Sequence, residues 1–392
     1  MAMTGARAAA VARPDAAASP ATSRAGWMDN LRVAVIAGVI ILHAATAYIL
    51  DVDWYYQERT TSTLTPLLLV FPALLGGLFG LGPLFLLGGL LAAASLAHKG
   101  PGGFARGRLV RLGLPLLAFF VLLDPLTGYL GALAESDHPR LWPYLADQTG
   151  TRDTGPLWFV AVLLALSLAY AGLRRLRPAR VGVTAGVGPR QLAAVAAVIA
   201  AGSFMMRLVS PLATDTYANL TWAAWPQATG LFTLGVLAGE RGRLESLDRR
   251  WLRRLGWVAV AGLLALAVLA ASALATDRGD AVAGGWTWQA AALALLEGLV
   301  AVGLSLWVVA WFRRRWDRRG ALVRRVGRGS YAAYVLHPPV LVLASMATRP
   351  LPLAPEGKFV LVAAVGVAAS FTLGAALTWR RVVVHVERPR VA

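Results

Sequence analysis

Long apolar runs separated by short polar segments recur along the whole chain. The runs reach 20 residues or more, and a helix needs about 20 apolar residues to cross a hydrocarbon core about 30 Å thick. The pattern therefore predicts an all-α polytopic membrane protein. We expect ten transmembrane helices, near residues 31–50, 66–97, 109–133, 156–173, 190–210, 222–239, 252–275, 288–312, 330–347 and 357–380.

The second apolar run is longer than one straight span and shorter than two spans joined by a turn. Proline and glycine inside a helix favour a bend or a break. We expect the run to bend, or to begin as a segment at the outer surface, at the residues Pro72, Gly76, Gly77, Gly80, Gly82 and Pro83.

The two ends of the chain are polar. Residues 1–25 are rich in Ala, Ser, Thr, Pro and Arg and contain no apolar stretch long enough for a signal peptide, which predicts an uncleaved, disordered tail. The membrane domain is expected over 26–384, followed by a short tail at 385–392, with no fused soluble domain.

The basic residues lie in alternate loops. With both termini in the cytoplasm, about 31 of the 38 Lys and Arg residues fall on the cytoplasmic side, 6 fall outside, and Arg207 lies within a span. This is the positive-inside pattern of a plasma or inner membrane protein, and it holds only for an even number of spans. The net charge of +18 is therefore explained by topology and not by a nucleic-acid partner.

Few polar residues lie inside the spans, and His43 is the first of them. A helix that enters the bilayer near Leu31 rises about 1.5 Å per residue, so His43 lies roughly 18 Å along its axis, past the middle of the membrane. An ionisable residue at that depth suggests a functional site. Asp124 and Glu297 are expected at a similar depth and could form an acid/base cluster with it. The alternative is a structural network that pairs helices, and for either carboxylate taken alone we favour that alternative. Arg207 is expected to snorkel towards an outer end.

A second candidate site is the basic segment Arg106-Gly-Arg108-Leu-Val-Arg111, where the third span leaves the cytoplasm. Arg108 and Arg111 are three residues apart and are expected on one helical face. Two guanidinium groups there can hold phosphate oxygens, and a helix N-terminus would add backbone donors. The alternative is that these arginines only set topology.

Five motifs along the chain resemble, in order, those of the acyltransferase 3 family of integral membrane acyltransferases. They are Asp29-x-x-Arg32 with His43, Gly82-Pro83-Leu-Phe85-Leu-Leu-Gly88-Gly89, Arg108-x-x-Arg111-Leu-x-x-Pro115, Leu157-Trp158-Phe159, and Ser330-Tyr331-x-x-Tyr334-x-x-His337-Pro338. Ten spans is also the family's count. The subgroup most resembled includes proteins that succinylate periplasmic glucans.

The chain departs from the family pattern in two places. Gly88-Gly89 replaces the Ser-Gly of many members, so no serine can act there, and the Trp-Ser-Leu-x-x-Glu element of another branch is missing from the fourth span. A role for an acid at that place is therefore in doubt.

The resemblance implies transfer of an acyl group, acetyl or succinyl, from cytoplasmic acyl-CoA to a hydroxyl of an extracytoplasmic glycan. It implies that Arg108 and Arg111, with Arg106, hold the phosphates of coenzyme A, and that His43 is the general base or carries the acyl group. The remaining motif residues are expected to shape the substrate site: Asp29, Arg32, Trp158, Tyr334 and His337. For His337, hydrogen bonding to a carbonyl freed by Pro338-Pro339 is an equal alternative.

Two other classes of function stay open from the sequence. A secondary transporter of an anionic or acylated solute would use His43, Asp124 and Glu297 as a proton relay, although no internal repeat is visible. A non-catalytic envelope scaffold would need them only for packing. A metal site is not expected, because the chain has no cysteine and its histidines and carboxylates lack ligand spacing.

Overall fold

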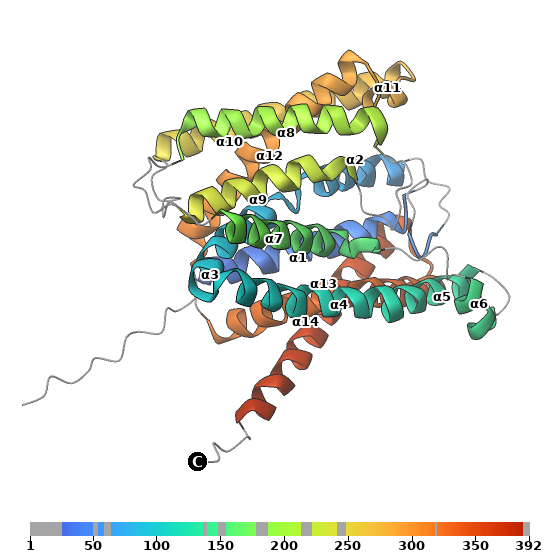
Figure 1. Ribbon diagram of the computed structural model, residues 1–392. Coiled ribbons are helices and arrows are strands. Elements are labelled where there is room, and N and C mark those ends of the chain that lie inside the picture. The colour runs from blue at the N-terminus through green and yellow to red at the C-terminus, as the bar shows by residue number, and fades with distance from the viewer. Residues whose placement is uncertain are drawn as a thin grey trace, which may run out of the picture.

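The chain forms a bundle of long helices that lie roughly parallel in Figure 1, with α8 and α10 at the top of that view and α14 at the bottom. The computed structural model describes residues 26–49, 54–58, 64–135, 139–147, 154–177, 187–212, 222–240, 248–317 and 320–386. The predicted tail at 1–25 and most of the one at 385–392 lie outside these residues. Every element of three or more residues in the described part is helical.

The first half of the described chain contains α1 (Gly26–Thr46), α2 (Leu64–Phe79), α3 (Gly82–Arg108), α4 (Leu114–Ala118), α5 (Asp124–Glu135), α6 (Leu141–Asp147) and α7 (Trp158–Leu176). The second half contains α8 (Pro189–Val209), α9 (Trp225–Glu240), α10 (Arg249–Ala275), α11 (Gly279–Ala283), α12 (Trp288–Arg315), α13 (Ala321–Thr348) and α14 (Pro355–Val386). Two π-helical turns, Leu109–Gly113 and Phe119–Leu123, join α3, α4 and α5 without a break.

Eight helical stretches in the described part are long and apolar enough to cross a membrane. One of them, Leu68–Ala134, covers the third predicted span and all but the first two residues of the second. The predicted sixth span corresponds to α9, which has only 16 residues. The all-α, multi-pass membrane architecture is thus confirmed, while the count of ten and the orientation stay predictions.

The second apolar run breaks, as its glycines and prolines predict. α2 ends at Phe79, and α3 begins at Gly82 with Pro83 in its first turn, where the missing N–H of proline costs nothing. A second break lies inside α3 at Gly100, whose φ of 68° lies in the left-handed region that glycine tolerates best. Pro101 then starts the segment that leads to the arginines.

Small residues let pairs of helices pack closely. A Cβ at Gly89 of α3 would collide with the carbonyl of Phe232 in α9, and a Cβ at Gly235 of α9 would collide with the carbonyl of Leu86. Between α13 and α14 the glycines Gly329 and Gly374 meet in the same way. Close approach of small residues is how membrane helices gain packing energy. Gly89, which matches the glycine of the family's Ser-Gly, thus has a packing role.

The beginning of α1 and the end of α12 lie on the same end of the bundle. The backbone N–H of Trp27 donates to Asp317 at 3.0 Å, and the side-chain amide of Asn30 donates to the carbonyl of Trp316 at 2.6 Å. We call this end, which also carries Arg313 and Arg314, the basic face. The predicted alternation of basic loops requires an even number of membrane passes from the start of α1 to the end of α12, so that both ends lie on one side.

Candidate active site

His43 lies in the last turn of α1, and its ring faces the inside of the bundle. The ring stacks on the indole of Trp54, with centroids 4.8 Å apart and planes 16° apart. On another side it meets His337 of α13, with ring centroids 5.0 Å apart. His337 is completely buried, whereas His43 is half-buried. An imidazole held between two rings keeps a defined orientation while part of its surface stays open.

The hydrogen bonds of the two histidines assign their tautomers. Nδ1 of His337 lies 2.6 Å from the carbonyl oxygen of Tyr334, one turn earlier. A carbonyl only accepts, so this nitrogen carries the proton of a neutral ring. Nε2 of His337 then has a lone pair, and it lies 3.2 Å from Nδ1 of His43.

His43 therefore donates from Nδ1, and the lone pair of its ring is on Nε2. An uncharged imidazole whose Nε2 accepts protons and whose Nδ1 is fixed by a partner has the arrangement that a general base requires.

The segment 54–58 covers the His43 ring. Next to Trp54, the hydroxyl of Tyr55 donates to Asp124 at the start of α5, at 2.6 Å. At the other end of the segment, Lys358 of α14 donates to Glu58 at 2.5 Å. These two polar contacts hold the stacked indole in place. Asp124 is thus connected to His43 through Tyr55 and Trp54 and is not its direct partner.

The motif residues of α13 and α7 meet beside this pair. The hydroxyl of Tyr334, which is 3% exposed, donates to the carbonyl of Pro156 just before α7. Its ring lies 5.5 Å from the ring of His337 and 6.2 Å, edge to face, from Phe159. Phe159 in turn packs 4.6 Å from Phe85 of α3. Four of the five motifs are thus joined by a continuous row of rings.

Trp158 has a less central position than its motif suggests. It is half-buried, and its ring lies 6.4 Å from the ring of Phe85. The neighbouring Phe159 makes the contact to Tyr334. Trp158 therefore lies on α7 beside the Phe85 end of the aromatic row.

The remaining motif, which contains Arg108 and Arg111, forms a cationic cluster away from the histidines. Arg108 is close enough to Arg111 and to Arg32 for each of these two positive charges to repel it. Arg32 also pairs with Asp29 at 3.4 Å in the first turns of α1. Arg108 lies over the ring of Phe104, with its guanidinium carbon 5.0 Å from the centroid. Positive charges gathered at this cost in repulsion favour an anionic ligand.

The backbone at this cluster differs from the expectation in one respect. The helix does not begin near Arg106, since the break lies earlier, at Gly100. The N–H of Leu109 donates to the carbonyls of Ala105 and Arg106, so it is not available to a phosphate. Arg111 instead lies in a π-helical turn, a feature often found at functional sites. The prediction of a helix N-terminus beside these arginines was wrong.

The structure divides the predicted cluster of acids. Glu297 of α12 forms an ion pair with Arg207 of α8, and both side chains are almost completely buried. Arg207 is 0% exposed, so the prediction that it snorkels was wrong: its charge is met inside the bundle by a carboxylate. A buried charge needs such a partner because desolvation is costly. Glu297 therefore joins α8 to α12, whereas His43 has its partners on α13.

Sequence reasoning missed two neighbours of His43. His337 is 294 positions away from His43 in the sequence. The sequence indicated only that both rings lie inside predicted spans. Trp54 follows the first span in a segment that the hydrophobic pattern treats as a loop. For metals, no group of three or more His, Asp or Glu side chains comes together in the described part of the chain.

A comparison with protein-family models matches residues 25–379 to the acyltransferase 3 model, which is described as an acyltransferase domain. A search of curated proteins and a search of solved structures found no match. The matched range contains every predicted site residue, from Asp29 to His337. Since the match covers nearly the whole chain, the protein belongs to the acyltransferase 3 family of membrane-embedded O-acyltransferases.

Proposed function

We propose that this membrane acyltransferase moves an acetyl or succinyl group from cytoplasmic acyl-CoA to a hydroxyl of an extracytoplasmic glycan, as in the glucan-succinylating subgroup. The observation that supports this best is the His43–His337 pair, with a nitrogen distance of 3.2 Å. It leaves His43 with a proton-accepting Nε2 inside the bundle. A hydroxyl is a poor nucleophile at neutral pH, so its acylation needs such a base.

In the proposed reaction His43 takes the proton of the acceptor hydroxyl while the hydroxyl oxygen attacks the thioester carbonyl. The C–S bond then breaks, the ester C–O bond remains, and the thiolate of coenzyme A leaves with the proton that His43 returns. His337 stabilises the charged imidazolium by accepting from its Nδ1–H throughout. In the variant with a transient acyl-histidine, Nε2 attacks the thioester carbonyl, the C–S bond breaks, and the thiolate of coenzyme A leaves. The glycan hydroxyl then attacks the acyl carbon, the C–N bond to His43 breaks, and the hydroxyl proton passes to the thiolate.

The donor is proposed to bind at the arginine cluster. Coenzyme A carries phosphate groups, and guanidinium groups bind phosphate through paired, charge-assisted hydrogen bonds. Arg32, Arg108 and Arg111 supply three such groups close together. The loops around this cluster are among the basic ones, which supports a position on the cytoplasmic side under the positive-inside rule. Arg106 is exposed beside it.

The proposal is tested by label transfer. Purified protein is incubated with radiolabelled acetyl-CoA or succinyl-CoA and cell-envelope glycan, and label in the glycan is measured. We expect His43→Ala to lower transfer by about 10²- to 10⁴-fold, the usual contribution of a general base. The matched control is His98→Ala, since His98 is an exposed histidine of α3. A His43→Ala protein with full activity would refute the assignment.

The same experiment separates the enzyme from a proton-coupled carrier, because only an enzyme transfers label. The carrier hypothesis needs Glu297 in a relay with His43. That carboxylate is instead paired with Arg207 between α8 and α12. The geometry therefore favours the base-catalysed reaction.

A further inference from the structure

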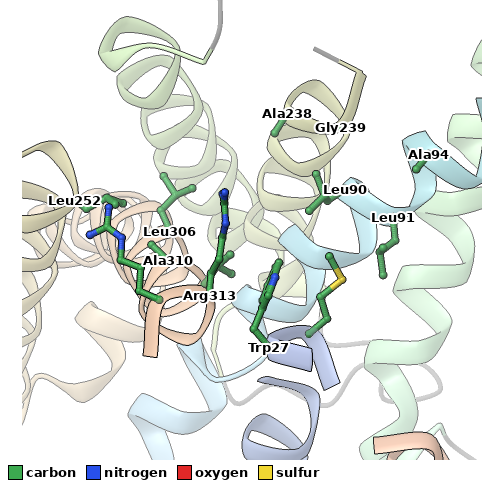
Figure 2. Close-up of a pocket in the computed structure, with 13 residues that line it drawn as sticks. Trp27, Leu90, Leu91, Ala94, Ala238, Gly239, Leu252, Leu306, Ala310 and Arg313 are labelled. Carbon is green, nitrogen blue, oxygen red and sulfur yellow. The ribbon is translucent and has the colours of Figure 1, made fainter. Parts of the chain in front are cut away.

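A cavity of about 560 Å³ opens among five helices near the basic face, apart from the histidine pair. Figure 2 shows Trp27 on α1, Leu90 on α3, Ala238 on α9, Leu252 on α10 and Arg313 on α12 around it. Its volume is within the range of small-molecule and cofactor sites, about 300 to 1,000 Å³. The described residues that line it include neither His43 nor any of Arg32, Arg108 and Arg111.

The walls of this cavity are apolar. Leu252, Leu306, Val309 and Ala238 are each less than 9% exposed. The remaining wall residues are Met28, Leu90, Leu91, Ala94, Gly239 and Ala310. Such a surface suits a hydrocarbon chain, and its side chains offer no hydroxyl, amide or carboxylate to a polar ligand.

The rim of the cavity has a net positive charge, with two arginines and the carboxylate of Asp317. Arg313 and Arg314 are exposed residues in the last turn of α12, and Trp27 lies beside them at the start of α1. The rim is held in shape by the donation of the Trp27 N–H to Asp317 at 3.0 Å. Arginine and tryptophan at the end of an apolar slot match a lipid whose headgroup is negative and whose chains are apolar.

We propose that this cavity binds an anionic membrane phospholipid, with its phosphate at Arg313 and Arg314 and one acyl chain between α3, α9, α10 and α12. Basic pockets between membrane helices on the cytoplasmic side are known sites for such headgroups. Coenzyme A fits less well, because its adenosine and pantetheine amides need hydrogen-bond partners that these walls lack. The lipid would fix the end of α12 against α1 and so support the bundle next to the donor site.

The test is native mass spectrometry of the full-length protein in neutral detergent, titrated with phosphatidylglycerol or phosphatidylcholine. We expect preferential binding of phosphatidylglycerol. The double variant Arg313→Gln with Arg314→Gln should weaken it by about thirtyfold, given the attraction of two cations to an anionic headgroup. Ala310→Leu narrows the cavity without changing charge and should weaken both lipids.

The control pair is Arg324→Gln with Arg325→Gln, two exposed arginines at the start of α13 that do not line the cavity. This pair should bind phosphatidylglycerol like the wild type. An equal loss in both double variants would show general attraction to basic loops and would overturn the proposal. Displacement of bound phosphatidylglycerol by excess coenzyme A would also overturn it, because the cavity would then be a donor site.

Discussion

Replacement of His337 tests the chemistry of the site most directly, since this residue is proposed to act only through His43. His337→Phe keeps a ring of similar size in a position that is 0% exposed, but removes the lone pair that faces Nδ1 of His43 at 3.2 Å. His337→Gln keeps a side-chain oxygen that can accept from the same Nδ1–H. The two variants therefore differ mainly in one hydrogen-bond acceptor.

The expected size of the effect follows from the hydrogen bond that is lost. An unsatisfied buried donor costs about 1–3 kcal/mol, which corresponds to roughly 5- to 150-fold in rate if the cost falls on the transition state. We expect His337→Phe to lower kcat by this factor and His337→Gln to restore most of it. The KM for acyl-CoA should not change, because the arginine cluster is untouched.

The assay is transfer of label from radiolabelled acyl-CoA to envelope glycan, measured per folded protein. Thermal unfolding in detergent shows whether each variant still folds. If His337→Phe had the kcat of the wild type with normal folding, His337 would have no part in orienting the base. If both variants lost kcat equally, packing of α13 and not hydrogen bonding would be the cause.

Three further predictions concern other parts of the site. Arg108→Ala with Arg111→Ala should raise the KM for acyl-CoA by at least about tenfold, since hydrogen bonds to charged groups contribute about 1.5–3 kcal/mol each. Trp54→Ala should lower kcat by roughly 2- to 10-fold, the equivalent of an aromatic contact of about 0.5–1.5 kcal/mol, and Trp54→Phe should keep most activity. Glu297→Ala should destabilise the fold by about 3–5 kcal/mol, because it leaves Arg207 buried without its partner, while activity per folded protein is kept.

Each of these predictions has a result that contradicts it. For the arginines, the exposed Arg175→Ala is the control, and an unchanged KM in the double variant would return both residues to a topological role. For Trp54, equal rates of Trp54→Ala and wild type would show that the stacked indole has no part in orienting His43. For Glu297, a fall in kcat without a fall in unfolding temperature would show that this carboxylate takes part in the reaction.

The hydrophobic pattern predicted the architecture because the bilayer dictates it. Spans of about 20 apolar residues follow from membrane thickness, and the break in the second run follows from its glycines and prolines. The inward position of His43 was likewise predictable, because a polar ring facing lipid is costly. These inferences need only local sequence and the properties of the solvent.

The partners of the polar residues were not predictable in the same way. Arg207 was placed at a helix end by counting, but its environment depends on a carboxylate 90 positions away on another helix. The backbone donors expected beside Arg108 depend on where the helix begins, and Gly100 sets that point two turns earlier. The packing of the helices decides which side chains meet across the bundle, and the hydropathy pattern does not predict that packing.

The distance between the two parts of the proposed site is set by α1 itself. Arg32 and His43 lie on this helix 11 residues apart, which is about 16 Å along the axis. A donor held by its phosphates at Arg32, Arg108 and Arg111 can reach His43 only if its thioester is separated from the phosphates by an extended arm. Coenzyme A has such an arm in its pantetheine unit, and the small acyl group at its end needs little room beside His43. The separation therefore favours a donor of this shape over acyl phosphates, in which the reacting carbon and the phosphate are neighbours.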